Sequence, residues 1–191
     1  MMSTKFPILA QWLLSQCTIL CCSRPFRIVE IEFYLFSKDH PDPYVHRSPD
    51  QERRMTWYFH KTKKGNYRGG TFKGLDLTLG KPGEFFGILL RSIYDLKTRE
   101  LITGPCRVVH KFLEVSDSSS IEDLTKNWTS FDADCNDDLL LQWENSKQIP
   151  IYYGPRIGLS DKDPEYQDRK YRFSSINKKI KDCRSLTLFH L

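Results

Sequence analysis

The sequence predicts an α+β protein, a single domain over residues 1–191 in which helices edge a curved antiparallel β-sheet. A chain of 191 residues has the ordinary length of one domain, and its aromatic content of 13% exceeds that of most disordered chains. Residues 27–35 alternate apolar and polar side chains with the period of two that a β-strand requires. Several further strand-like runs are separated by glycine and proline, whereas helical patterns are few.

The alternating strand contains the most informative residue of the chain, Glu32. The apolar residues of residues 27–35 should point to the core, while the other face presents Glu30, Glu32 and Tyr34. Two carboxylates and a ring are unusual on the outer face of a purely structural strand. They suit a site that binds a flat ligand and activates water, although a solvent-facing strand residue is the plainer interpretation of Glu32.

The other elements follow from the same patterns. One face of a short helix should carry Leu9, Trp12, Leu13 and Gln16. Strands are expected at residues 18–20, 56–60, 71–79 and 85–93, with a hairpin tip at 61–70, a loop at 38–54 and a turn at Gly104 and Pro105. A helix over 107–113, a serine-rich linker over 116–120, an acidic region over 121–145 and short strand ends at 156–159 and 171–173 complete the prediction.

Composition argues against several classes of protein. None of the six cysteines forms a CxxC motif, which favours free thiols in a reducing compartment, the nucleus or the cytoplasm. The five histidines lack metal-ligand spacing, so we expect no metal and no other cofactor. Residues 6–22 are apolar enough to suggest a signal peptide, but polar residues interrupt them and favour a core helix. No segment reaches the ~20 apolar residues of a membrane span, so a membrane is not an expected partner.

The net charge of +5 tolerates a polyanion without demanding one. Basic residues crowd positions 53–73 and 169–181, whereas acids concentrate between 114 and 144. Such blocks are compatible with solvated faces and equally with a nucleic-acid footprint.

Six segments in a fixed order carry a family likeness. They are residues 9–14 (LAQWLL), 27–35 (RIVEIEFYL), 42–47 (DPYVHR), 87–93 (GILLRSI), 104–107 (GPCR), and 156–159 together with 169–173 (RIGL and RKYRF). In this order they resemble the alkyladenine (3-methyladenine) DNA glycosylase family. The six segments span nearly the whole chain, and their combination is more specific than any one of them.

The resemblance implies a DNA glycosylase of base-excision repair, an enzyme that hydrolyses the N-glycosidic bond of alkylated or deaminated purines after base flipping. Glu32 matches the family's catalytic glutamate, which deprotonates the attacking water, and Arg91 matches the arginine that helps to hold that water. On chemical grounds alone, a carboxylate that is ionised at neutral pH can serve as such a base. Arg91 can also be a strand-end arginine paired with Glu30 or Glu32, and the two interpretations are compatible.

The same resemblance assigns the walls of a base pocket. Tyr34 and His46 match residues on opposite sides of the flipped base, His60 takes the place of a stacking tyrosine, and Asp76 takes the place of an asparagine that disfavours normal guanine. An ionised carboxylate only accepts hydrogen bonds, so Asp76 should favour a base edge that donates them. The last two are departures from the family pattern.

The basic hairpin is the expected DNA contact. Lys63, Lys64 and Arg68 surround Tyr67, which lies near the predicted tip and could replace the family's minor-groove wedge, because simple counting puts a glycine at the wedge position. A surface tyrosine in a solvated hairpin is the plainer interpretation.

Two other functions stay open. The chain could be a non-catalytic nucleic-acid-binding relative that kept the cleft, which the changes at Asp76 and at the wedge favour. It could instead be an N-glycosidic hydrolase acting on RNA or free nucleosides, for which no wedge is needed. In the leading interpretation the partner is double-stranded DNA containing damaged purines, and the protein is a monomer.

Overall fold

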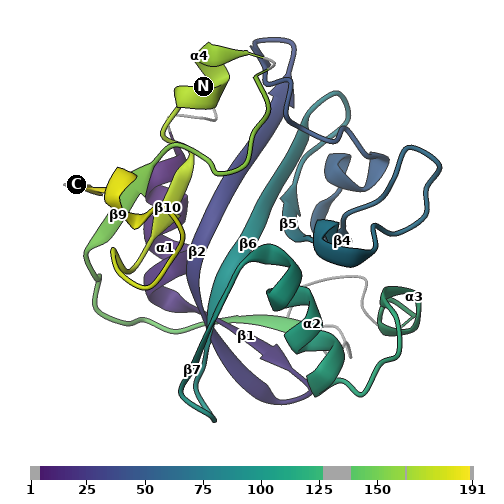
Figure 1. The fold of residues 1–191 in the computed structure, drawn as a ribbon, viewed down its shortest axis with the longest axis vertical. Coiled ribbons are helices and arrows are strands. Elements are labelled where there is room, and N and C mark those ends of the chain that lie inside the picture. The colour runs from purple at the N-terminus through teal and green to yellow at the C-terminus, as the bar shows by residue number, and fades with distance from the viewer. Residues whose placement is uncertain (1–4, 127–138, 162, 190–191) are drawn as a thin grey trace.

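A computed structural model describes residues 5–126, 139–161 and 163–189 (Figure 1). It contains one open sheet of antiparallel strand pairs with a few helices, as the sequence predicts. The main path of the sheet is β11 (Thr187–Phe189), β9 (Ile151–Gly154), β10 (Arg172–Ser174), β2 (Arg24–Ser37), β6 (Phe85–Asp95), β5 (Leu75–Leu79) and β4 (Arg54–Phe59). Beside this path, β1 (Cys17–Cys21) pairs with β2 and with β8 (Leu139–Trp143), β3 (His40–Pro41) pairs with β2, and β7 (Glu100–Thr103) pairs with β6.

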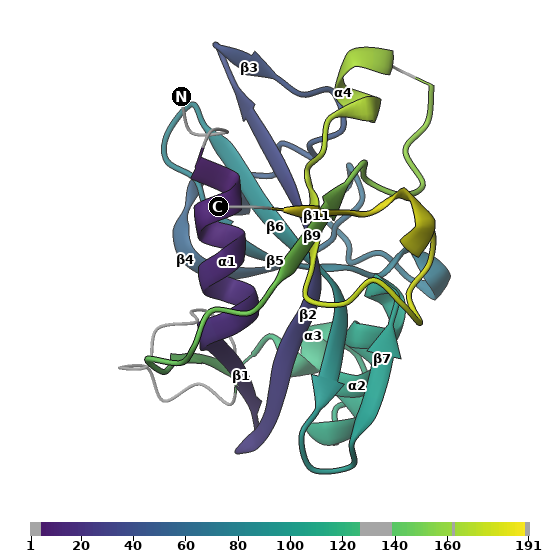
Figure 2. The ribbon, with the colours of Figure 1, turned by 90° about the vertical axis from the view of Figure 1, so that its left-hand side faces the viewer.

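The two longest helices of the described chain cover different parts of the sheet. Helix α1 (Phe6–Gln16) runs beside β2, whereas α2 (Pro105–Val115) lies against β6 and β7 (Figures 1 and 2). Two short helices, α3 (Ile121–Leu124) and α4 (Pro164–Asp168), are capped by the side chains of Ser120 and Asp163. Short 3₁₀ turns are η2 (Pro49–Glu52), η3 (Gly70–Phe72) and η4 (Cys183–Ser185).

Aromatic rings join the helices to the sheet. Phe6 of α1 stacks on Phe33 of β2 with ring centroids 4.4 Å apart, and Phe112 of α2 meets Phe26 edge-on at 5.4 Å. All four side chains are buried, and each contributes roughly 1.5–3 kcal/mol by leaving water. The two helices therefore pack on opposite ends of the longest strand.

The predicted face of α1 is confirmed in part. Leu13 is buried, and Leu9 and Trp12 pack against the core while partly exposed. The fully buried face is rotated from the predicted one and consists of Phe6, Ala10, Gln11, Leu13 and Leu14. The helix begins at Phe6, and the contacts of the Phe6 ring with β2 and with Tyr171 set its rotation.

The β2–β6 pair contains two register shifts that cancel each other. The pairing runs from Ile28 with Ile93 to Glu30 with Ser92 and then to Ile31 with Leu90, so Val29 and Arg91 are each skipped. Extra residues of this kind bend a strand and re-aim side chains. Here they leave Glu30, Glu32 and Tyr34 on one face, as predicted, and release Arg91 from the ladder.

Two predicted elements were wrong in extent. Residues 156–159 form a loop, and the strand before them, β9, was not foreseen. Strand β5 starts only at Leu75, because η3 occupies residues 70–72. The linker over 116–120 is confirmed, since α2 ends at Val115 and α3 begins at Ile121, and residues 127–138 of the acidic region lie outside the described residues.

Candidate active site

The face of β2 that carries Glu30 and Glu32 is buried, which corrects the interpretation of Glu32 as a solvent-facing strand residue. Glu30 is 2% exposed and Glu32 is 0% exposed. Arg172 of the neighbouring β10 lies over this face and donates to the carbonyl oxygens of Lys181 and Asp182, at 3.0 and 2.9 Å. These bonds hold the C-terminal segment across β2. The alternation of apolar and polar residues in β2 could not predict that another segment would bury its polar face.

Every oxygen of the Glu32 carboxylate has a partner. The Tyr34 hydroxyl donates to Oε2 at 2.8 Å, and the backbone N–H of Ile157 donates to Oε1 at 2.8 Å. Arg91 Nη1 lies 3.3 Å from Oε1. Burial alone would lower the pKa of Arg91, but the charges of Glu32 and Glu30 outweigh it and raise that pKa. The predicted pairing of Arg91 with these carboxylates is confirmed.

Glu30 has a different environment on the same face. Ser92 donates to its Oε2 at 2.6 Å, while Arg91 and Arg172 lie 3.4 and 3.5 Å from Oε1. Burial raises the pKa of Glu30 in spite of these cations, and burial also lowers the pKa of Arg172. Glu30 therefore takes up a proton more readily than an exposed glutamate.

A cavity of about 290 Å³ brings the predicted base contacts together. Tyr34, His46, His60 and Asp76 all line it, although they come from β2, the loop that follows β3, the β4–β5 connection and β5. The remaining lining residues are Tyr44, Gln51, Arg68, Gly158, Leu159 and Ser160. Glu32 lies directly behind Tyr34, whose hydroxyl it binds.

Tyr34 is held from one side by Arg156, whose guanidinium lies 4.5 Å from the ring centroid. Arg156 is itself fixed by Asp42, through contacts of 2.6 and 3.2 Å, and both side chains are fully buried. Burial, followed by the charge of Glu32, raises the pKa of Tyr34 well above its ordinary value. The hydroxyl therefore stays protonated and can only donate to Glu32.

Asp76 turns toward protein groups, which corrects its predicted role as a free acceptor on the pocket floor. Its Oδ1 lies 2.8 Å from His60 Nε2, and its Oδ2 accepts a hydrogen bond from Gln51 Nε2 at 3.2 Å. Asp76 is 2% exposed, whereas the side chain of His60 retains 15% exposure. The imidazole rather than the carboxylate is the polar group that this wall offers to a ligand.

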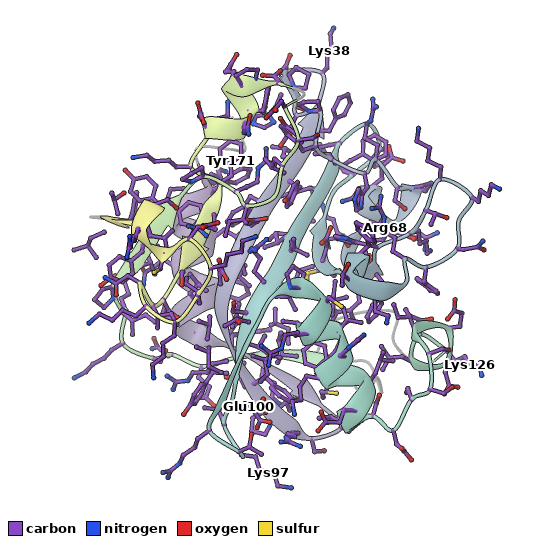
Figure 3. All side chains as sticks on the ribbon, in the orientation of Figure 1. Lys38, Arg68, Lys97, Glu100, Lys126 and Tyr171 are labelled. Carbon is purple, nitrogen blue, oxygen red and sulfur yellow. The ribbon has the colours of Figure 1, made fainter. Side chains whose placement is uncertain are left out.

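The hairpin places its four predicted DNA contacts differently. Lys63 and Lys64 lie in the exposed turn, where the N–H of Gly65 bonds to the carbonyl of Thr62, and neither lysine has an ion pair with a described residue. Tyr67 is not at the tip: it is partly buried against the core, and its hydroxyl donates to Thr125 at 3.1 Å. Arg68 lines the cavity on the side of β4 and β5 (Figure 3). The exposed ring of this connection is Phe72, at 71% exposure.

A second, larger depression of about 730 Å³ adjoins the cavity and shares Tyr44, His46 and Arg68 with it. Its further lining includes Arg47, Lys61 and Lys63, against one acid, Asp50, which already pairs with Lys61 at 2.6 Å. The mouth of the cavity is therefore basic.

Sequence reasoning missed Tyr44, Gln51 and Arg156 at the site. The Tyr44 hydroxyl donates to the Ser160 carbonyl at 2.6 Å and so joins the two loops at the rim of the cavity. Polar residues in loops carry no periodic signal, so their burial could not be predicted. The resemblance around residues 42–47 and 156–159 pointed to the segments that contain Tyr44 and Arg156, but it does not include Gln51.

In residues 5–126, 139–161 and 163–189, no cluster of three or more His, Cys, Asp or Glu side chains could hold a metal ion. Within those same ranges no helix is long and apolar enough to cross a membrane.

Comparison with known proteins yields one clear relative. The chain is 43% identical over 202 residues to "Uncharacterized protein L759" of Acanthamoeba polyphaga mimivirus, in an alignment that covers 97% of this chain and 92% of the viral protein. No family model matches the chain.

Proposed function

The chain belongs to the family of the mimivirus protein L759, and from the geometry of its site we propose that it is a monofunctional DNA glycosylase that removes damaged purines. The convergence of Tyr34, His46, His60 and Asp76 on one cavity carries this proposal. The resemblance places all four residues at base-binding positions of the alkyladenine DNA glycosylases. In the sequence they are spread over more than forty residues. Their meeting at one place is what a shared site requires.

The cavity suits a flat ligand that arrives on a polyanion. Its volume of about 290 Å³ lies near the lower end of the range for small-molecule sites. Tyr34 and His46 offer planar faces, and a base stacked on an aromatic side chain gains about 1–3 kcal/mol. The basic depression beside the cavity supplies charges for the phosphates that flank a flipped nucleotide.

In the proposed reaction, water attacks C1′ of the flipped nucleotide while the bond from C1′ to the base breaks. The electron pair of that bond leaves with the base. Glu32 accepts a proton from the water through a lone pair that its present partners do not use. Arg91 places a positive charge beside the carboxylate and helps to fix its orientation, and Tyr34 lies between the carboxylate and the cavity.

The burial of Glu32 favours one competing function. Glu32 is 0% exposed, and its partners are a hydroxyl, an amide and a guanidinium. A glutamate with a purely structural role would have the same surroundings. A non-catalytic nucleic-acid-binding protein would keep the cavity and the basic depression without needing water at Glu32.

Base release from a duplex separates the two functions. We expect Glu32→Gln to slow single-turnover release of an alkylated or hypoxanthine base by about 10²–10⁴-fold, the usual contribution of a general base, while duplex binding persists. Glu30→Gln is the matched control, because Glu30 shares the strand face, the burial and Arg91, but bonds to Ser92 instead of Tyr34.

Binding without any release by the wild-type protein would establish the non-catalytic function. Equal losses in both variants, together with equal falls in melting temperature, would mean that the strand face acts through stability alone and would refute Glu32 as the base.

A further inference from the structure

We propose that a depression at the N-terminal end of β2 binds an acidic segment of a partner protein, an extended peptide in which an apolar side chain is flanked by carboxylates. The depression has a volume of about 500 Å³ and lies between the β2, β6 and β7 strands and the C-terminal segment. Its volume falls within the usual range of ligand sites. This binding does not depend on the activity proposed for the cavity.

The floor of the depression is a row of side chains across three strands. Arg27 of β2 pairs with Tyr94 of β6, and Tyr94 pairs with Leu101 of β7, so the three side chains share one face of the sheet. Tyr94 and Leu101 are half-buried, and Val29, which also lines the depression, is buried. The floor therefore offers apolar surface and an aromatic ring to the side chain of a ligand.

The C-terminal segment forms a wall that is anchored to the same strand. Val29 is skipped in the β2–β6 ladder, and its carbonyl accepts hydrogen bonds from the backbone N–H and the hydroxyl of Ser175, at 2.9 and 3.3 Å. Ile176 and Lys179, which follow along the chain, also line the depression. The wall is thus fixed to the strand that forms the floor.

Three cations surround this apolar floor. The side chains of Arg27, Arg99 and Lys179 are exposed, and none of them has an ion pair with a residue in the described part of the chain. Among the described residues that line the depression, none is acidic. The charge of the site is therefore complementary to the carboxylates of an acidic ligand.

The acids at the nearby β6–β7 turn already have other partners. Asp95 at the end of β6 pairs with Arg24, and Glu100 at the start of β7 lies 3.3 Å from Lys111 of α2. Neither acid lines the depression. The three cations are therefore available to carboxylates that come from another molecule.

Apolar floor and basic rim together favour a protein segment over a nucleic acid. Arginine and tyrosine are enriched among the residues that dominate the energy of protein–protein interfaces. A duplex would contact the cations through its phosphates and would leave the floor without an apolar partner. Strand β7 pairs only with β6 among the described strands, so an extended peptide also finds an edge that none of those strands occupies.

The site is separate from the cavity. Arg27 and Tyr34 are seven residues apart on β2, which corresponds to about 20 Å at the usual rise of a strand. In Figure 3, Lys97 and Glu100 mark the β6–β7 turn at the lower end of the molecule, whereas Arg68, which lines the cavity, lies well above them. A partner segment can occupy this site while the cavity holds its own ligand.

A peptide of sequence Glu-Glu-Leu-Glu-Glu, capped at both ends and labelled with a fluorophore, tests the site by fluorescence anisotropy. We expect saturable binding to the wild-type chain. Replacing the leucine with serine removes the apolar anchor and should weaken binding by about 10–100-fold. Replacing the four glutamates with glutamine should abolish saturable binding, because the cations then lose their partners.

A pair of matched double variants places the peptide on this surface. Arg27→Gln combined with Arg99→Gln should weaken binding of the leucine peptide by about 10–100-fold, because two charge-assisted contacts are lost. Lys38→Gln combined with Lys97→Gln removes the same charge outside the depression and should leave binding unchanged. All four replaced side chains are exposed, so the melting temperatures of both double variants should equal that of the wild type.

Four outcomes would overturn the proposal. The first is no saturable binding of the leucine peptide up to about 1 mM. The second is an equal loss in both double variants, which would mean that net charge alone attracts the peptide. Displacement of the peptide by a single-stranded thymidine oligonucleotide that binds the wild type but not the arginine variant would assign the surface to nucleic acid. Self-association of the wild type that the arginine variant abolishes would assign it to a second copy of this chain.

Discussion

Glu32 of β2 and Asp76 of β5 are two buried carboxylates that pair with the same residue of β6, Leu89, and their partners differ. Glu32 meets a guanidinium, a hydroxyl and a backbone amide, of which the guanidinium carries a permanent charge. Asp76 meets an imidazole and a neutral amide. Arginine is charged at every physiological pH, so Glu32 has a permanent cation beside it, whereas neither partner of Asp76 carries a permanent charge. The two carboxylates therefore differ in how their buried charge is compensated.

The largest effect that would sharpen this comparison is on stability. Arg91→Gln should lower the free energy of unfolding by about 3–5 kcal/mol, because it leaves Glu32 buried without its cation. His60→Gln should cost only about 1–3 kcal/mol, the cost of an unmade hydrogen bond, because Gln51 still serves Asp76. Urea unfolding at neutral pH measures both values. Equal costs would show that the two carboxylates are held alike and would break the comparison.

A smaller effect concerns the room around Asp76. Gly87→Ala places a methyl group on the carboxylate and should cost about 1–3 kcal/mol, the usual range for overpacking, and base release should slow because the cavity wall shifts. Gly69→Ala is the control, since a Cβ there meets nothing within 4 Å and its φ is not positive. Thermal unfolding and base release are measured on both variants. Wild-type behaviour of Gly87→Ala would show that Asp76 is free to move.

The smallest effect lies outside both carboxylates. Replacing Lys63 and Lys64 with alanine should weaken duplex binding and reduce its salt dependence by about one unit of logarithmic slope per lost phosphate contact. Lys97→Ala, at the lower end of the molecule in Figure 3 and well away from Arg68 of the hairpin, should leave the slope as it is. An unaltered slope in the double variant would show that the hairpin turn does not meet DNA.

The sequence predicted which segments form strands and helices better than it predicted which segments pack against them. Strand β2 and helix α2 follow from periodicity, and strand β6 follows from its continuous apolar run. Strand β9, the rotation of α1 and the burial of the Glu30 face depend instead on tertiary partners: β10 and β11 beside β9, Phe33 and Tyr171 against Phe6, and Arg172 above Glu30. Alternation reports which side a residue faces and not what lies on that side.

At the site, residue identities were easier to predict than contacts. The cavity contains all four predicted base contacts, but Asp76 points to His60, and Tyr67 packs inward onto Phe59 rather than projecting from the tip. Both outcomes depend on which neighbour a polar tip reaches. A single sequence without tertiary contacts does not encode that choice in any local pattern.

The skipped residues of the β2–β6 ladder, Val29 and Arg91, make the two strands dependent on each other in length. Loss of Val29 alone would join Ile28 directly to Glu30 and leave β2 one residue shorter than β6 between the Ile28–Ile93 and Ile31–Leu90 pairs. Loss of Arg91 alone would leave β6 the shorter strand over the same stretch. Loss of both residues together would keep the two strands equal in length there, so the length of each strand at the centre of the sheet is constrained by the length of the other.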